Sequence, residues 1–373
     1  MKNRGTNISI LISFFLVCGI MTAQESSSFK DAFKDKFYIG VAINRQQAMG
    51  NNKLEQQIIQ SEFNSISPEN DLKWENIHPT KDSYNFTAAD AYVKTGKDMN
   101  MQIIGHTLLW HSQTPDWVFK DDKGNTIKRD ALLDRLRDHI NTVMGRYKGI
   151  IKGWDVVNEA LNEDGSLRNS KWRTIIGEDY IEKAFEYAHA ADPAAELYYN
   201  DYNLYKKEKC AGAVKIVKVL KAKGLLITAV GEQGHYSLTG PSLNDVEAAI
   251  KSFIDAGTRV NFTELDISVL PDKGASTTAD VSNSATYLKE LDPYKEGLPS
   301  EIEKKLADRY KGLFILFMKY HDKIDRITLW GLSDRASWLN NWPIRGRTNY
   351  PLPYNRDMSV KVEVKQGILQ AAM

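Results

Sequence analysis

An acidic pair interrupts an apolar stretch of the 373-residue chain, residues 260–269 (VNFTELDISV). The stretch reads as a strand, in which successive side chains alternate between faces, so Glu264 and Asp266 point the same way. Burying two carboxyl groups costs free energy unless they are solvated, hydrogen-bonded or used in chemistry. The pair is therefore either a salt-bridged strand end or part of an acid-base site, and the rest of the chain must decide.

Polar side chains or tryptophans also follow nearly all of the remaining apolar stretches that we expect to be strands. They occur in the clusters ENDLKW (69–74), HTLLWH (106–111), NE (158–159), NDY (200–202) and QGH (233–235), and at Trp330 and Trp338. Taken singly, Trp330 could be core packing and His106 a structural histidine. Their concurrence at strand after strand is much less expected by chance than any one cluster.

These residue types suit the binding and cleavage of polysaccharides. Tryptophan faces stack on pyranose rings, and amide and lysine side chains hydrogen-bond sugar hydroxyls. Two carboxyl groups on different strands, Glu159 and Glu264, can serve as the acid and the nucleophile that cleave a glycosidic bond. The sequence therefore predicts carbohydrate hydrolysis.

Two other kinds of catalytic site fit the sequence poorly. His106 and His111 would face opposite sides of an extended segment, and no His-x-x-x-His motif or cysteine pair accompanies them, so we expect no metal and no cofactor. A serine hydrolase would need a Gly-x-Ser-x-Gly turn, and the chain has none.

Apolar, strand-like segments alternate with amphipathic, helix-like segments along the chain. The expected strands are 37–42, 65–67, 101–106, 153–158, 196–200, 226–231, 260–269 and 327–331. The expected helices are 53–63, 88–99, 133–149, 179–191, 207–223, one that opens at Ser242 and Asp245, 300–319 and 360–369. About eight such units predict an α/β fold, a single (β/α)8 TIM barrel with its active site at the carboxyl ends of the strands. An open doubly wound sheet is the alternative, but no Gly-rich nucleotide loop follows any strand.

The first 23 residues differ from the rest. Lys2 and Arg4 precede an apolar run at 8–20, and Ala23 offers a small residue for cleavage. This pattern predicts a secretory signal peptide, because the run is too short to span a bilayer. We expect residues 24–36 to form a polar lead-in, residues 37–373 to form the catalytic barrel, and the protein to be exported, either secreted or periplasmic.

Removing residues 1–23 leaves 47 basic and 48 acidic residues, a net charge of −1. A nearly neutral protein has no electrostatic reason to bind nucleic acid or anionic membranes. Cys18 follows Val17 rather than a small residue, which argues against a lipid anchor. Cys18 would leave with the signal peptide, so Cys210 would have no disulfide partner.

Five motifs give the chain a resemblance to a known family. They are GHTLLWH (105–111), WDVVNE (154–159), GEQGH (231–235), TELD (263–266) and WGLSD (330–334). In these the chain resembles the family 10 glycoside hydrolases, endo-β-1,4-xylanases of the two-glutamate barrel clan, from about residue 37 to the last helix. The resemblance implies Glu159 as general acid/base, Glu264 as nucleophile and retention of anomeric configuration.

The resemblance also implies roles around these two glutamates. Asn158 would bond the 2-hydroxyl of the sugar in subsite −1, and Gln233 would lie beside Glu159. His235 would bond Glu264 and be oriented by Asp266. Of the two acidic residues on this strand, Glu264 would then be the nucleophile and Asp266 a residue that supports His235.

The remaining roles concern the sugar subsites, and Trp338 would act as a lid that crowds the extra hydroxymethyl group of a hexose. The expected positions are Glu69, Asn70 and Lys73 at subsite −2, His106 and Trp110 bordering the −1 sugar, and Trp330 beneath it. The implied partners are xylan and xylo-oligosaccharides, with the protein acting as a monomer. We expect no appended carbohydrate-binding module, so that substrate capture depends on the barrel groove.

Two alternatives remain open. An endoglucanase of the same clan shares the Asn-Glu pair on the fourth strand and the glutamate on the seventh. A non-catalytic sugar-binding barrel would usually lack one of the two carboxylates, and both are present here.

Overall fold

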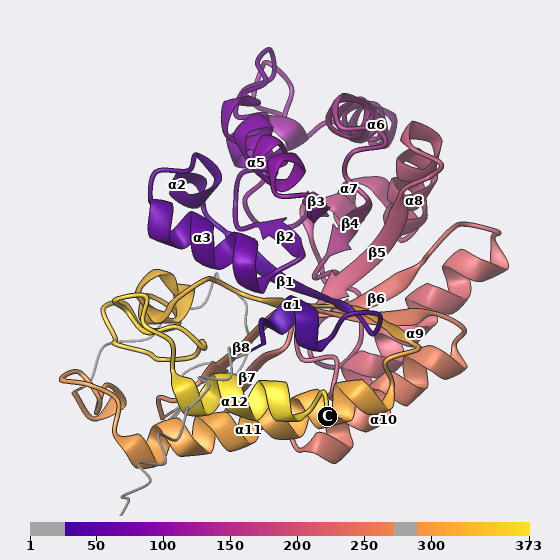
Figure 1. The fold of residues 1–373 in the computed structure, drawn as a ribbon. Coiled ribbons are helices and arrows are strands. Elements are labelled where there is room, and N and C mark those ends of the chain that lie inside the picture. Colours follow the sequence, from indigo (N-terminus) through magenta and orange to yellow (C-terminus); the bar gives the residue numbers. More distant parts are fainter. Residues whose placement is uncertain (1–26, 272–288) are drawn as a thin grey trace, which may run out of the picture.

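The computed structural model describes residues 27–271 and 289–373. A closed, parallel β-barrel forms its centre (Figure 1). Its strands are β1 (Tyr38–Ile43), β2 (Ser65–Pro68), β3 (Gln102–Trp110), β4 (Gly153–Asn158), β5 (Glu196–Asp201), β6 (Ala229–Glu232), β8 (Arg259–Ser268) and β9 (Ile324–Leu329). Neighbours in this order pair in parallel, and β9 pairs with β1 to close the ring. The predicted single (β/α)8 barrel is confirmed.

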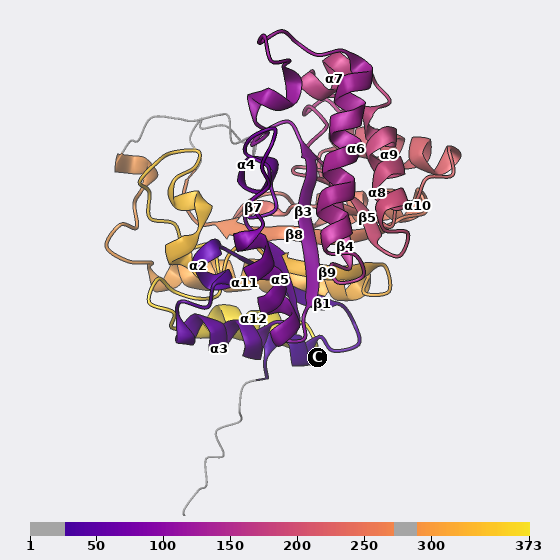
Figure 2. The ribbon, with the colours of Figure 1, turned by 90° about the horizontal axis from the view of Figure 1, so that it is seen from above.

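Helices surround the barrel on its outside (Figures 1 and 2). They are α1 (Phe29–Ala32), α2 (Arg45–Ala48), α3 (Lys53–Glu62), α4 (Trp74–Ile77), α5 (Thr87–Asp98), α6 (Arg129–Arg146), α7 (Lys171–Ile176), α8 (Tyr180–Ala191), α9 (Lys207–Ala222), α10 (Leu243–Asp255), α11 (Ser300–Lys319) and α12 (Val362–Gln370). At α10 the Ser242 side chain caps the helix by accepting from the backbone N–H of Asp245, as its sequence suggested. Within the described ranges, no helix is long and apolar enough to cross a bilayer.

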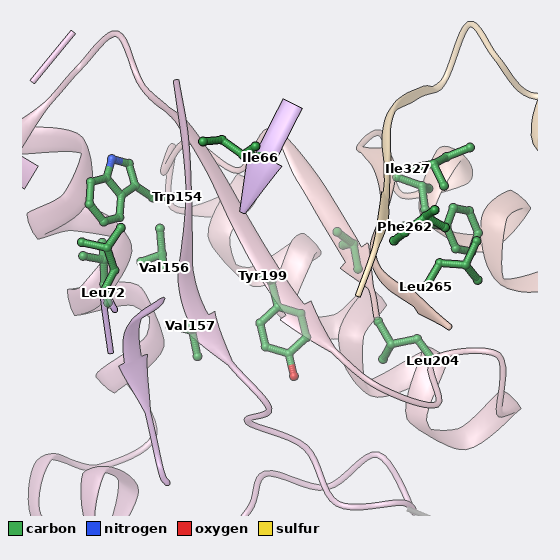
Figure 3. Packing of buried hydrophobic residues seen from close by; sticks show 14 of the residues in the cluster. Ile66, Leu72, Trp154, Val156, Val157, Tyr199, Leu204, Phe262, Leu265 and Ile327 are labelled. Atoms are coloured by element: carbon green, nitrogen blue, oxygen red, sulfur yellow. The ribbon is translucent and has the colours of Figure 1, made fainter. Parts of the chain in front are cut away.

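The main hydrophobic core lies between the strands and the helices. Figure 3 shows part of it, with side chains from β4 (Trp154, Val156, Val157), β8 (Phe262, Leu265) and β9 (Ile327). The neighbouring strands β3 and β4 are so close that a Cβ added at Gly105 of β3 would stand 2.1 Å from the Trp154 ring of β4. Only glycine fits there, at the start of the GHTLLWH motif.

Most predicted elements lie within a few residues of their observed positions, and the differences fall near the strand ends. The third strand continues to Trp110, beyond the predicted end at His106, and its pairing with β4 shifts register after His106. A short strand that the sequence did not suggest, β7 (His235–Ser237), pairs in parallel with the end of β8. Helix α7 and the short helices α2 and α4 were also not predicted.

The predicted signal peptide, residues 1–23, lies outside the described residues. Of the expected lead-in, residues 24–36, the described part from residue 27 is not merely polar. It contains α1, and both Phe29 and Phe33 are buried in the core.

Candidate active site

A pocket of about 140 Å³ opens at the carboxyl ends of the barrel strands. It is lined by Glu69, Asn70, Lys73, His106, Trp110, Gln113, Asn158, Glu159, Gln233, His235, Glu264, Trp330 and Trp338. Every residue expected to touch the substrate is therefore in one place. Asp266 lies behind the pocket, in contact with two of its lining residues.

Glu159 follows β4 directly and is 4% exposed. Trp110 Nε1 donates to Oε2 at 2.8 Å, and Gln233 Nε2 donates to Oε1 at 3.0 Å. Burial raises the pKa of Glu159 to about 7, helped by the negative charges of Asp201 and Glu264 and opposed by the two hydrogen bonds. A carboxyl group with this pKa is largely protonated in mildly acidic solution and can donate a proton.

Glu264 projects from β8 and has the opposite ionisation behaviour. Burial alone would raise its pKa, but hydrogen bonds and positive charge outweigh burial and lower it. Asn200 Nδ2 donates to Oε1 at 2.8 Å and His235 Nε2 to Oε2 at 3.2 Å. The carboxylate is thus held ionised in a fixed orientation, as a nucleophile requires.

His235 lies between Asp266 and Glu264 and contacts both. Its Nδ1 lies 3.0 Å from Asp266 Oδ1, while Nε2 faces Glu264. Burial disfavours the charged imidazole, but Asp266 and Glu264 raise the pKa of His235 to about 10. Asp266 also accepts from Trp338 Nε1 at 2.7 Å. The expected contacts of His235 are present, and Asp266 in addition anchors the tryptophan.

Asn200, at the end of β5, joins the two sides of the site. Its Nδ2 donates both to Glu264 Oε1 and, at 2.9 Å, to Asn158 Oδ1, while Thr263 Oγ1 donates to Asn200 Oδ1 at 2.6 Å. Asn158 Nδ2 in turn donates to Glu159 Oε1 at 3.2 Å. The sequence placed Asn200 at a strand end but gave it no role, because neighbours from two other strands, β4 and β8, define that role.

Lys73 forms the centre of a second group, on the loop after β2. Its Nζ donates to Asn70 Oδ1 at 2.9 Å and to Gln113 Oε1 at 3.0 Å, and lies 4.9 Å from the centre of the Trp110 ring. Burial lowers the pKa of Lys73 and raises that of Glu69. Gln113 was not predicted as a site residue. It lies in the loop after β3 with a left-handed backbone (φ +44°), where no strand or helix periodicity indicates which way a side chain points.

His106 and Trp330 complete the floor of the pocket. His106 Nδ1 lies 2.9 Å from Asp155 Oδ2, a partner that the sequence did not suggest. The two rings meet edge to face with 5.6 Å between their centres. Among the described residues, no three His, Cys, Asp or Glu side chains are grouped so that they could hold a metal ion.

Comparisons with known proteins agree with this geometry. Residues 28–369 match the model of glycosyl hydrolase family 10. Endo-1,4-beta-xylanase A of Xylanibacter ruminicola is 45% identical over 93% of this chain and 94% of its own length. A GH10 endoxylanase structure from a sugarcane soil metagenome superposes with a TM-score of 0.90 and 45% identity, covering 92% of this chain and 99% of the other. A mutant structure in complex with xylotriose gives a TM-score of 0.81 and 36% identity over 91% and 99% of the two chains.

Proposed function

Because the chain belongs to glycosyl hydrolase family 10, we propose that it is an endo-1,4-β-xylanase that hydrolyses internal bonds of xylan with retention of configuration. Two of the relatives named above are endo-xylanases according to their names, and a third similar structure was solved with xylotriose. One observation carries the proposal. Two buried glutamates of the same pocket have opposite pKa shifts, Glu159 upward and Glu264 downward.

In the first step Glu159 acts as the acid. Its proton goes to the glycosidic oxygen while a carboxylate oxygen of Glu264 attacks the anomeric carbon. The bond between that carbon and the glycosidic oxygen breaks, and a covalent glycosyl-enzyme forms as the shortened xylan leaves. The donor from Trp110 holds the acid in place.

In the second step Glu159, now a carboxylate, takes a proton from a water molecule that attacks the anomeric carbon from the vacated side. The ester to Glu264 breaks, and both glutamates return to their starting states. Two inversions give net retention. The positively charged His235 keeps Glu264 oriented, and Asn158 bonds the 2-hydroxyl of the sugar in the transition state.

Preference for xylose over glucose comes from Trp338 in this proposal. The ring is held by its bond to Asp266, by His235 with 4.7 Å between ring centres, and by stacking on Trp342 at 4.7 Å. A tryptophan held in this way cannot easily move aside for a hydroxymethyl group. A difference of only about 1–3 kcal/mol in transition-state binding free energy between the two sugars is enough to make the enzyme prefer xylose.

The direct test compares hydrolysis of soluble xylan and carboxymethylcellulose by the purified protein. We expect a much higher rate on xylan, with short xylo-oligosaccharides as products by mass spectrometry and the β-anomer formed first by NMR. A higher rate on carboxymethylcellulose would support an endoglucanase instead. Initial formation of the α-anomer would overturn the double displacement.

We further infer that the chain is exported and acts as a monomer on xylan and xylo-oligosaccharides. The support for export is the basic start, the apolar run at residues 8–20 and the small residue Ala23. The make-up of the pocket supports monomer function, because all of the residues proposed to act come from one chain.

A further inference from the structure

A fully buried ion pair lies behind the turn that carries Glu159. It joins Asp201, at the end of β5, to Lys209, in the first turn of α9. Neither residue lines the pocket. We propose that Asp201 and Lys209 are positioning residues for Glu159, acting through the backbone of residues 159–161, a proposal that rests on the acid/base role given to Glu159 above.

The turn after β4 needs outside support. Glu159 has a left-handed backbone (φ +56°), a region that a residue with a β-carbon occupies only when its surroundings hold it there. Its N–H donates to Asn200 O at 2.8 Å, and its carbonyl accepts from Arg168 Nε at 3.2 Å. The backbone N–H of Arg168 also donates to Ala160 O at 2.7 Å.

Asp201 is the third residue, after Asn200 and Arg168, that holds this turn by hydrogen bonds. Its Oδ2 accepts from the backbone N–H of Leu161 at 3.3 Å and from the Tyr199 hydroxyl at 2.5 Å. Its Oδ1 accepts from the N–H of Tyr202 at 2.9 Å. Tyr199 belongs to the core shown in Figure 3, so the carboxylate is fixed at one end to the barrel and at the other to the turn.

Lys209 is the buried ion-pair partner of that carboxylate. Its side chain is 0% exposed, and Nζ lies 3.0 Å from Asp201 Oδ1, 3.3 Å from Glu163 Oε1 and 3.4 Å from the centre of the Tyr202 ring. A buried lysine is stable only when paired, and removing one partner leaves the other charge uncompensated. Loss of Lys209 would therefore free Asp201 from the position in which it bonds Leu161.

The pair also acts on Glu159 through charge. After burial, the charge of Asp201 is the next cause of the raised pKa of Glu159. Glu264 and Lys73 also interact electrostatically with Glu159. The titratable groups that interact with Asp201 besides Lys209 are Glu232, Tyr180 and Tyr199. Asp201→Asn removes a negative charge, so it lowers the pKa of Glu159 and moves the alkaline limb of the pH profile downward.

The test separates positioning of the acid from general damage by using two substrates. Xylohexaose has a poor leaving group and needs a proton from Glu159, whereas 2,4-dinitrophenyl β-xylobioside does not need one in the step that kcat/KM reports. We expect Asp201→Asn and Lys209→Met to lose about tenfold or more on xylohexaose and less than about twofold on the dinitrophenyl glycoside. For Asp201→Asn the alkaline limb on xylohexaose should also fall by about half a pH unit or more.

Lys365→Met is the matched control, because it removes another buried lysine, which pairs with Glu62 at 2.6 Å and lies outside the pocket. It should leave both rates close to wild type. If the first two variants unfold, Tyr199→Phe keeps the ring and removes one bond to Asp201, and the same selective loss is expected at smaller size.

Equal losses on the two substrates, or an unmoved alkaline limb in Asp201→Asn, would overturn the positioning role while leaving the proposed function intact. A wild-type protein inactive on both substrates, or a Glu159→Ala variant with full activity on xylohexaose, would overturn the proposed function and this inference with it.

Discussion

At the residue scale, two identical side chains acquire opposite properties from their neighbours. Glu159 receives bonds from neutral donors and faces negative charge, whereas Glu264 receives a bond from a positively charged imidazole. The first is thereby held ready to give up a proton and the second is held ionised.

The pH dependence of kcat/KM follows from these two groups. The acid must be protonated, so activity is present below the pKa of Glu159, about 7, and is lost as the pH rises through that value. The nucleophile must be ionised, so activity is also lost at low pH, where Glu264 takes up a proton. A pH profile of kcat/KM on xylohexaose checks this. An alkaline limb unchanged by Glu159→Gln, at whatever residual rate remains, would speak against the assignment.

Removing either carboxyl group should have a distinct effect. Glu264→Ala should lower xylan hydrolysis by more than about 10⁴-fold, because no covalent intermediate can form. Glu159→Ala should lose about 10²–10⁴-fold on xylan, keep more activity on dinitrophenyl glycosides, and regain rate with added azide. Rates and circular dichroism spectra should be compared with those of Glu301→Ala, an exposed glutamate of α11. Near-normal activity in Glu264→Ala would end the proposal.

At the element scale, the loop that carries Lys73 is attached to α6 by a stack of rings. Trp74, the first residue of α4, lies on His139 of α6 with 3.6 Å between ring centres, and His78 lies on Tyr84 at 3.7 Å. Trp74 Nε1 also donates to Leu108 O at 2.5 Å. The loop that we expect to form a sugar subsite is thus supported by packing among residues that do not line the pocket.

The stack makes stability depend on pH. Burial lowers the pKa of both His78 and His139, with the charge of His78 adding to the effect at His139. Below the ordinary value of about 6.5 the unfolded chain takes up protons that the folded protein refuses. The contribution is therefore fully present above that pH and is lost as the pH falls toward the lowered folded values. Urea unfolding at pH 7.5 and 5 measures it.

A variant isolates this contribution from that of other groups. His139→Phe keeps a ring on Trp74 and removes one titrating group, so its loss of unfolding free energy between the two pH values should be smaller than in wild type. His189→Phe, at an exposed position of α8, is the control and should behave as wild type. A pH dependence that is the same in all three proteins would contradict the explanation.

At the scale of the whole molecule, closure of the barrel makes distant segments into neighbours. The pairing of β9 with β1 and of β6 with β8 completes the ring. Residues in or after β2, β3, β4, β6, β8 and β9 then line one pocket. Residues from 69 to 338 meet there, so the site needs nearly the entire described chain. Truncation at either end of the barrel is incompatible with this arrangement.

Export is the prediction that belongs to the whole chain. Expressed in full in a bacterial host with a general secretion pathway, the protein should appear outside the cytoplasm, shortened near Ala23. Cell fractionation and the intact mass of the product check this, with a chain starting at Gln24 as the cytoplasmic control. An unprocessed product that stays in the cytoplasm would remove the basis for export.

The sequence by itself determined the strand–helix alternation, the polar strand ends and the two glutamates, because these depend on local periodicity and residue type. It also placed Glu264 and Asp266 on one face, since the strand period is two. Element ends were less accurate where pairing decided them, as at the extension of β3 to Trp110 and at β7.

Only the tertiary structure decided which groups act on which. Asn200 joins Asn158 to Glu264, Gln113 holds Lys73, and Asp155 meets His106, although long stretches of chain separate the partners. Burial, hydrogen bonding and charge act through space and not along the chain. Two glutamates that look alike in the sequence therefore acquire opposite pKa shifts only when the barrel closes around them.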